Sequence, residues 1–187
     1  MTYYKSGSFT RATILGTVKE VKTFSSKKDG KEYTALVVTT EEKYKTKEGE
    51  DKTLTSEVKV FLSGKTEVKP SSVVLVEGDV CTAKVPFKTE LKYPVEQAVV
   101  SDATVQVVSE VAGASFSGLN SFELIGRIGR QPREIKGGKG CDFSLAISPK
   151  NKETLWVPIS FWGQRGMKLL TILNKGDLVR IVAKASL

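Results

Sequence analysis

Histidine is absent from the 187-residue chain, and cysteine is limited to Cys81 and Cys141. Because histidine is the usual general acid–base group and a common zinc ligand, its absence excludes His-based triads and His-containing zinc sites. Two cysteines do not make a disulfide scaffold, so we expect free thiols. The composition therefore predicts a protein that is not an enzyme and that needs no cofactor or metal.

Long apolar segments are also missing. No run approaches the roughly 20 apolar residues that cross a bilayer, and the first residues contain no apolar core of a signal peptide. The content of 40% hydrophobic and 27% charged residues is typical of soluble globular proteins. We expect a cytoplasmic protein without a membrane partner.

The positive charge is unevenly distributed. Residues 1–112 hold 17 Lys and Arg against 16 Asp and Glu, a net charge of +1, whereas residues 113–187 hold 12 against 5, a net charge of +7. Such a bias favours a polyanionic partner for the second part of the chain.

Short β-branched runs separated by Gly, Pro and charged turns predict an all-β protein. The plan occurs twice, because four short segments, which fall into three blocks at offsets of 110, 99 and 98 residues, repeat in the same order. Residues 14–18, 33–34, 58–60 and 78–79 match residues 124–128, 143–144, 157–159 and 176–177, respectively.

Each copy is expected to contain three strands, a short helix and a further strand, which is the plan of the OB-fold, a five-stranded Greek-key barrel. We predict two tandem OB-folds, at residues 1–111 and 120–187, joined by a linker at residues 112–119. The second copy has no obvious fifth strand.

The segment from Trp156 to Gly163 has an unusual alternation. In a strand, Val157, Ile159 and Phe161 fall on one face, which suits a core. The other face then carries both tryptophans of the chain, Trp156 and Trp162, where polar residues are usual. Two outward aromatics in a basic protein predict a surface on which nucleic-acid bases stack.

Four segments, residues 120–135, 143–147, 156–164 and 175–179, resemble bacterial-type single-stranded-DNA-binding proteins in order and spacing. The resemblance covers nearly all of the second copy, and the first copy shares only the fold plan. It implies that Trp156 and Trp162 stack on bases and that Arg127 lies near the bound strand. It also implies a homodimer presenting four OB-folds, replication or recombination proteins as partners, and a place at the nucleoid of a bacterial or phage-infected cell.

The remaining candidate residues are cations and one phenylalanine. Phosphate contacts are expected from Arg127, Arg130, Lys139, Lys150, Lys152 and Arg165. In the first copy Glu57 and Ser63 stand where the tryptophans would be, so a mainly structural or partner-binding role is expected there. Phe61 lies on its outward face and is retained as a candidate stacking residue.

The function predicted from the sequence is sequence-independent binding and protection of single-stranded DNA in replication, recombination or repair. Two alternatives stay open at this point: an RNA-binding or primosome-type OB protein, and an OB-fold subunit that binds other proteins.

Overall fold

The computed structural model describes residues 8–26, 29–84, 96–109, 118–148 and 153–185. The chain divides into two compact units. The N-terminal unit comprises Arg11–Phe122 and Ala183–Leu187, and the C-terminal unit comprises Met1–Thr10 and Glu123–Val182. Residues 112–117 of the predicted linker lie outside the described residues, so the domain boundaries read from the sequence stay predictions.

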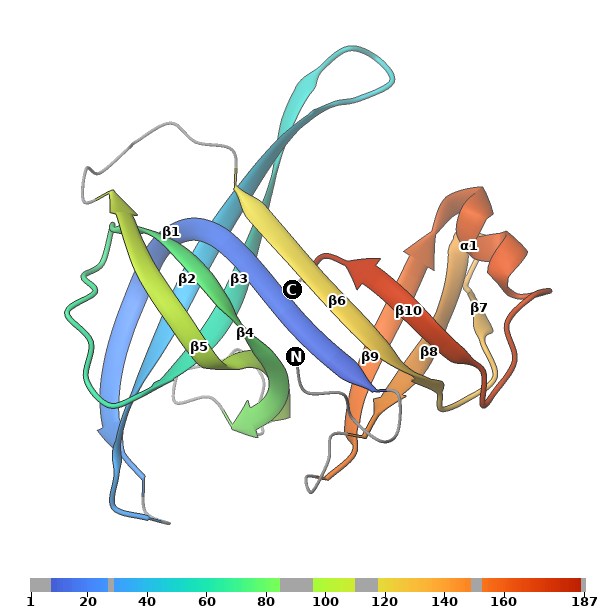
Figure 1. Cartoon of the computed structure of the whole chain (residues 1–187). Coiled ribbons are helices and arrows are strands. Elements are labelled where there is room, and N and C mark those ends of the chain that lie inside the picture. Colours follow the sequence, from blue (N-terminus) through green and yellow to red (C-terminus); the bar gives the residue numbers. More distant parts are fainter. Residues whose placement is uncertain (1–7, 27–28, 85–95, 110–117, 149–152, 186–187) are drawn as a thin grey trace. The chain divides into compact units, whose positions relative to one another are not determined.

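The N-terminal unit is a closed β-barrel (Figure 1). Its strands are β1 (Phe9–Ser25), β2 (Glu32–Lys45), β3 (Asp51–Ser63), β4 (Val73–Lys84) and β5 (Glu96–Ser109), the first two residues of β1 being assigned to the other unit. Going round the barrel, β1 pairs with β2, β2 with β3, β3 with β5, β5 with β4, and β4 again with β1. The β3–β5 pairing is parallel and the others are antiparallel. This is the Greek-key barrel expected for an OB-fold.

Alternation along the strands fills this barrel with branched aliphatic side chains. Ile14, Leu36, Val60 and Val74 are completely buried. Burial of each such side chain stabilises the fold by roughly 1.5–3 kcal/mol.

The β2–β3 hairpin extends well beyond the barrel (Figure 1). Cross-strand pairing continues to Lys45 and Asp51, so the charged segment at residues 41–52 is largely paired strand. Opposite charges face each other at its end, where Lys45 Nζ lies 3.9 Å from Asp51 Oδ1. Such cross-strand pairs support an exposed ribbon that has no core of its own.

The short helix predicted between the third and fourth strands of the first copy is wrong. Residues 64–72 contain no helix. Gly64 and Ser71, near the two ends of this segment, adopt positive φ angles of 84° and 72°, which are incompatible with a right-handed helix at these positions. The backbone of Val18 also pairs with this segment, donating to Ser72 O at 2.9 Å and accepting from Ser71 N at 2.7 Å.

The C-terminal unit contains the first four strands of an OB-fold and one short additional strand of three residues. The elements are β6 (Leu119–Ile128), β7 (Arg133–Ile135), β8 (Gly140–Ile147), β9 (Leu155–Trp162), α1 (Gly163–Leu169) and β10 (Leu178–Ala183). β8 pairs with β6, β7 and β9, and β10 pairs with β6. The expected helix, α1, follows β9, and in the described part of this unit no strand follows β10 to complete the OB barrel. In the described residues no helix has the length and apolar character needed to span a membrane.

Glycines at equivalent positions of the two units, Gly16 and Gly126, show that the sequence repeat is also a structural repeat. A Cβ on Gly16 would lie 2.5 Å from the carbonyl oxygen of Thr39, and a Cβ on Gly126 would lie 2.6 Å from that of Ala146. Both obstructing atoms belong to the backbone, which cannot easily move aside. Each unit therefore needs a glycine where its second strand passes closest to its first.

Candidate nucleic-acid interface

Strand β9 alternates between a buried and an exposed face. Val157 and Ile159 are 8% and 6% exposed, whereas Trp156 and Trp162 are 56% and 65% exposed. Phe161 is half-buried and stacks on Phe143, with ring centroids 6.1 Å apart. The structure thus places both tryptophans on the outward face, as the sequence alternation requires.

The indole of Trp156 lies directly over Gly129. A Cβ built on this glycine would overlap Cζ3 of Trp156, and even its distance to Cε3 would be only 3.1 Å. The Gly129 N–H donates to Ser144 O at 2.8 Å, which fixes the backbone beneath the ring. Gly129 lies within residues 120–135, which resemble the family, but nothing in the sequence pattern predicts that Trp156 packs against it.

Small residues lie beside Trp156 on the neighbouring strand. Ala146 is the cross-strand partner of Trp156, and Ser144 is that of Pro158. Since a strand rises about 3.3 Å per residue, the two tryptophan positions are about 20 Å apart along β9. The two exposed indoles are therefore separated along β9 by a stretch of sheet on which the neighbouring outward side chains of β8, Ala146 and Ser144, are small.

Arg127 occupies the same cross-strand row as Trp156. It pairs in register with Ala146, which in turn pairs with Trp156. Its Nη1 donates to Gly176 O at 2.9 Å, and the side chain stays exposed. The loop before β10 therefore orients a guanidinium that still faces solvent.

Arg130 is held by a carboxylate of the same face. Its Nη2 forms an ion pair with Asp142 Oδ2, and Asp142 is the cross-strand partner of Ser160 on β9. Among the described residues, no acceptor is found for the buried Nε of Arg130. Of the predicted phosphate-binding cations, this one is partly neutralised within the protein.

Lys139 and Arg165 are exposed near the other tryptophan. Gly140 is the cross-strand partner of Trp162, and the Gly163 N–H donates to Lys139 O at 2.7 Å. Arg165 lies in the first turn of α1, which starts directly after Trp162. Lys150 and Lys152 lie outside the described residues.

Phe61 belongs to a different aromatic group, in the N-terminal unit. It is half-buried, and its ring meets that of Phe24 edge-on at a centroid distance of 6.0 Å. Phe24 in turn stacks on Tyr33 at 6.0 Å. The structure does not place Phe61 with the tryptophan face; it joins two aromatics that the sequence analysis did not select.

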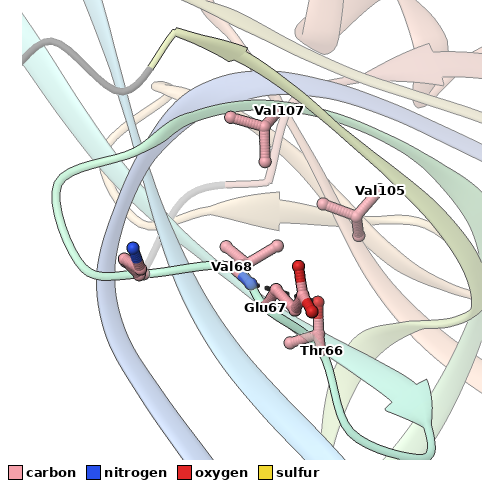
Figure 2. A pocket seen from close by; sticks show the side chains of 6 residues that line it. Thr66, Glu67, Val68, Val105 and Val107 are labelled. Atoms are coloured by element: carbon pink, nitrogen blue, oxygen red, sulfur yellow. Dashed lines mark hydrogen bonds between the residues drawn. The ribbon is translucent and has the colours of Figure 1, made fainter.

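A hollow of about 540 Å³ lies elsewhere in the N-terminal unit (Figure 2). It is lined by Thr66, Glu67, Val68, Lys69, Val105 and Val107. Thr66 Oγ1 accepts a hydrogen bond from the Val68 N–H at 3.3 Å. None of the predicted site residues is among the six that line it, so it does not contribute to this interface.

Neither cysteine is in a disulfide, Cys141 being buried and Cys81 partly buried. Burial, with a smaller contribution from the charge of Asp142, raises the pKa of the Cys141 thiol above its usual value of 9.0. In the described residues no three Cys, Asp or Glu side chains gather into a group that could hold a metal ion.

Comparison with known proteins agrees with this geometry. Residues 119–187 match the single-strand binding protein family. This match to the family covers the C-terminal unit from β6 onward and confirms the resemblance found in the sequence. No curated protein matches the chain.

The fold of the whole chain resembles that of solved proteins of this kind. The wild-type single-stranded DNA binding protein from Thermus aquaticus aligns with a TM-score of 0.71 at 17% identity, covering 96% of this chain and 85% of that one. A deletion mutant of the same protein gives a TM-score of 0.70 at 16% identity, covering 96% of this chain and 87% of that one. At this identity the likeness shows the fold, two OB-folds in one chain.

Proposed function

We propose that this protein binds single-stranded DNA without sequence preference and protects it during replication, recombination or repair. The observation that carries the proposal is the pair of exposed tryptophans on one face of β9, in the segment that matches the single-strand binding protein family. Bases of any sequence have a π-face that can stack on an indole, so such a surface needs no base-specific hydrogen bonds.

Cations around the tryptophans support the same proposal. Arg127, Lys139 and Arg165 are all exposed. Arg127 pairs with Ala146, the cross-strand partner of Trp156, and Lys139 precedes Gly140, the cross-strand partner of Trp162. Arg165 follows Trp162 in the chain, in the first turn of α1. Phosphate neutralisation by such groups supplies most sequence-independent affinity for nucleic acids. In this proposal the described cations hold the backbone while Trp156 and Trp162 hold bases.

Titration with oligo-dT tests the proposal, because both tryptophans of the chain lie on the proposed surface and report binding directly. We expect intrinsic fluorescence to be quenched on binding. The Trp156→Leu/Trp162→Leu variant has no tryptophan, so its affinity is measured by anisotropy of labelled oligo-dT, and we expect it to bind at least about 25-fold more weakly, at about 1–3 kcal/mol per stacked base. Tight binding without quenching, unaffected by the double substitution, would exclude the tryptophan surface.

Competition by oligo-U at equal length separates DNA from RNA binding. Preference for DNA supports the proposal as stated. Equal or stronger competition by RNA would instead assign the protein to RNA-binding OB proteins, since RNA recognition depends on contacts to the 2′-hydroxyl.

A further inference from the structure

The outward face of the N-terminal barrel carries an aromatic cluster formed by Phe24, Tyr33 and Phe61. Phe24 lies between the other two, stacked on Tyr33 and edge-on to Phe61. The three residues come from β1, β2 and β3, and all three are half-buried. Part of each ring surface therefore stays open to solvent.

The cluster lies outside the barrel, on a second small apolar layer. Ala35 and Val37 are buried, and Phe24 and Phe61 pack against them. Their chain neighbours Leu36 and Val38 are also buried and point the other way, into the barrel. Both faces of β2 are thus covered, and the outer cover is aromatic.

This face is equivalent to the tryptophan face of the C-terminal unit. The carbonyl oxygen of Thr39 faces Gly16, and that of Ala146 faces Gly126, so Thr39 and Ala146 are equivalent positions of the two units. Their cross-strand partners on the third strands are Glu57 and Trp156, respectively. Four residues further along these strands come Phe61 and Ser160. The partner of Phe61 is Ala35, whereas the partner of Ser160 is Asp142, which is ion-paired with Arg130. One unit has a charged pair where the other has aromatic rings.

Charged residues of both signs surround the cluster. Lys22 is the cross-strand partner of Ala35, and Lys59 is that of Val37, so both lysines point to the outer side of the sheet. Carboxylates lie on the same side, since Glu20 of β1 also pairs with Val37, and Glu57 of β3 is ion-paired with Lys19. Tyr33 is oriented by its hydroxyl, which donates to Asp29 Oδ2 at 2.8 Å.

We propose that Phe24, Tyr33 and Phe61 form a second base-stacking site for single-stranded DNA, in the N-terminal unit and built from residues that the family match does not cover. The loss of both tryptophan positions from this copy is offset by rings from three strands. This inference rests on the proposed function. It assigns a ligand to a unit for which the sequence comparison of the two copies predicts a mainly structural or partner-binding role.

The test uses the full chain in four forms: wild type, Phe24→Leu/Phe61→Leu, Trp156→Leu/Trp162→Leu, and the combination of all four changes. Leucine keeps an apolar cover over Ala35 and Val37 but cannot stack on a base. Tyr44→Leu is the matched control, because Tyr44 is an exposed aromatic residue of β2 that lies outside the cluster. Binding is measured by anisotropy of labelled oligo-dT from about 4 to about 32 nucleotides, the range of one to two OB-fold sites, and thermal melting verifies folding.

We expect Phe24→Leu/Phe61→Leu to lower the affinity for the longer oligonucleotides roughly fivefold or more, and the combined variant to bind more weakly than either pair alone. Tyr44→Leu should bind like wild type. Unchanged binding by Phe24→Leu/Phe61→Leu in both backgrounds would overturn the second site while leaving the tryptophan site intact. A changed oligomeric state in light scattering with unchanged DNA affinity would also overturn it and would assign the cluster to a subunit interface.

Discussion

Trp156 and Gly129 act as one feature at the scale of single residues. The alternation of β9 could be predicted from the sequence because Val157 and Ile159 are unambiguous core residues with the tryptophans on the opposite face. The role of Gly129 could not, because it depends on which backbone atoms pass beneath the ring after folding. The same limit hid Phe24 and Tyr33, which are separate in the sequence and meet only in the sheet.

Gly129→Ala should weaken DNA binding although it removes no side chain proposed to touch DNA. The new methyl group would displace the indole of Trp156 from its seat, so we expect a loss of affinity similar to that of Trp156→Leu, roughly fivefold or more. Oligo-dT titration of both single variants and the double variant measures this. If the displacement explains the loss, Gly129→Ala should add nothing in the Trp156→Leu background.

Asp142→Asn should strengthen DNA binding. It removes a negative charge from the face of β8 that carries Ser144 and Ala146, and it releases Arg130 from its ion pair. Because this pair is partly exposed, its own contribution to stability is small. Once released, Arg130 can bind one further phosphate, so we expect the log–log salt dependence of affinity to become steeper by about 0.7, measured by anisotropy at several salt concentrations. Lower affinity, or a shallower slope, would contradict this role of Asp142.

The Cys141 thiol should make the protein less stable at alkaline pH. Its raised pKa in the folded state means that the unfolded chain loses this proton first, so its stabilising contribution is complete below about pH 9.0 and declines as pH rises through the higher folded value. Urea unfolding across this range should show a smaller alkaline loss for Cys141→Ala than for wild type. In the native protein near neutral pH, Cys141 should also react slowly with thiol reagents, whereas urea should expose it.

At the scale of secondary structure elements, duplicated glycines and duplicated strands were the most predictable parts. Short β-branched runs fix the strands because each has one apolar face, and the block around Gly126 repeats the block around Gly16. The helix after the third strand, which the fold plan predicted in both copies, forms only in the second, over Gly163–Leu169. In the first copy, Gly64 and Ser71 with positive φ and the pairing to Val18 replace it with extended chain.

Gly126→Ala should destabilise the protein by roughly 1–3 kcal/mol, the usual cost of forcing an extra methyl group into a packed site. The obstructing atom is the carbonyl oxygen of Ala146, held in a strand pair, so the chain cannot yield locally. Chemical denaturation measures the change. Ser160→Ala on the exposed face of β9 is the control, and it should leave the unfolding free energy nearly unchanged.

At the scale of the whole molecule, the fold was predictable and the assembly is proposed. The OB-fold plan came from the order of the blocks, and the closed barrel of the N-terminal unit and the four strands of the C-terminal unit confirm it. The sequence could not show that each unit includes a short segment from the opposite end of the chain. Such membership depends on long-range pairing, to which local patterns are blind.

We propose a homodimer that presents four OB-folds to one DNA strand. Light scattering of the free protein should then give twice the chain mass of 20.4 kDa. Affinity for oligo-dT should fall steeply with salt, by a log–log slope of about 0.7 per phosphate bound. If light scattering shows that the protein stays a monomer while it binds oligo-dT tightly, the dimer is excluded. An affinity that does not change with salt would exclude the cationic groove.

The buried Asn120 side chain has a consequence for how the protein is made. Its amide accepts from Ala185 N at 3.0 Å and donates to Ala185 O at 2.8 Å, across 65 residues of sequence, and Lys184 pairs with Glu42 of the same unit. On the ribosome, domains usually complete their folding in order of synthesis. Here the barrel whose strands are translated first receives these bonds only after nearly the whole of the second unit has been synthesised, so its folding is completed late.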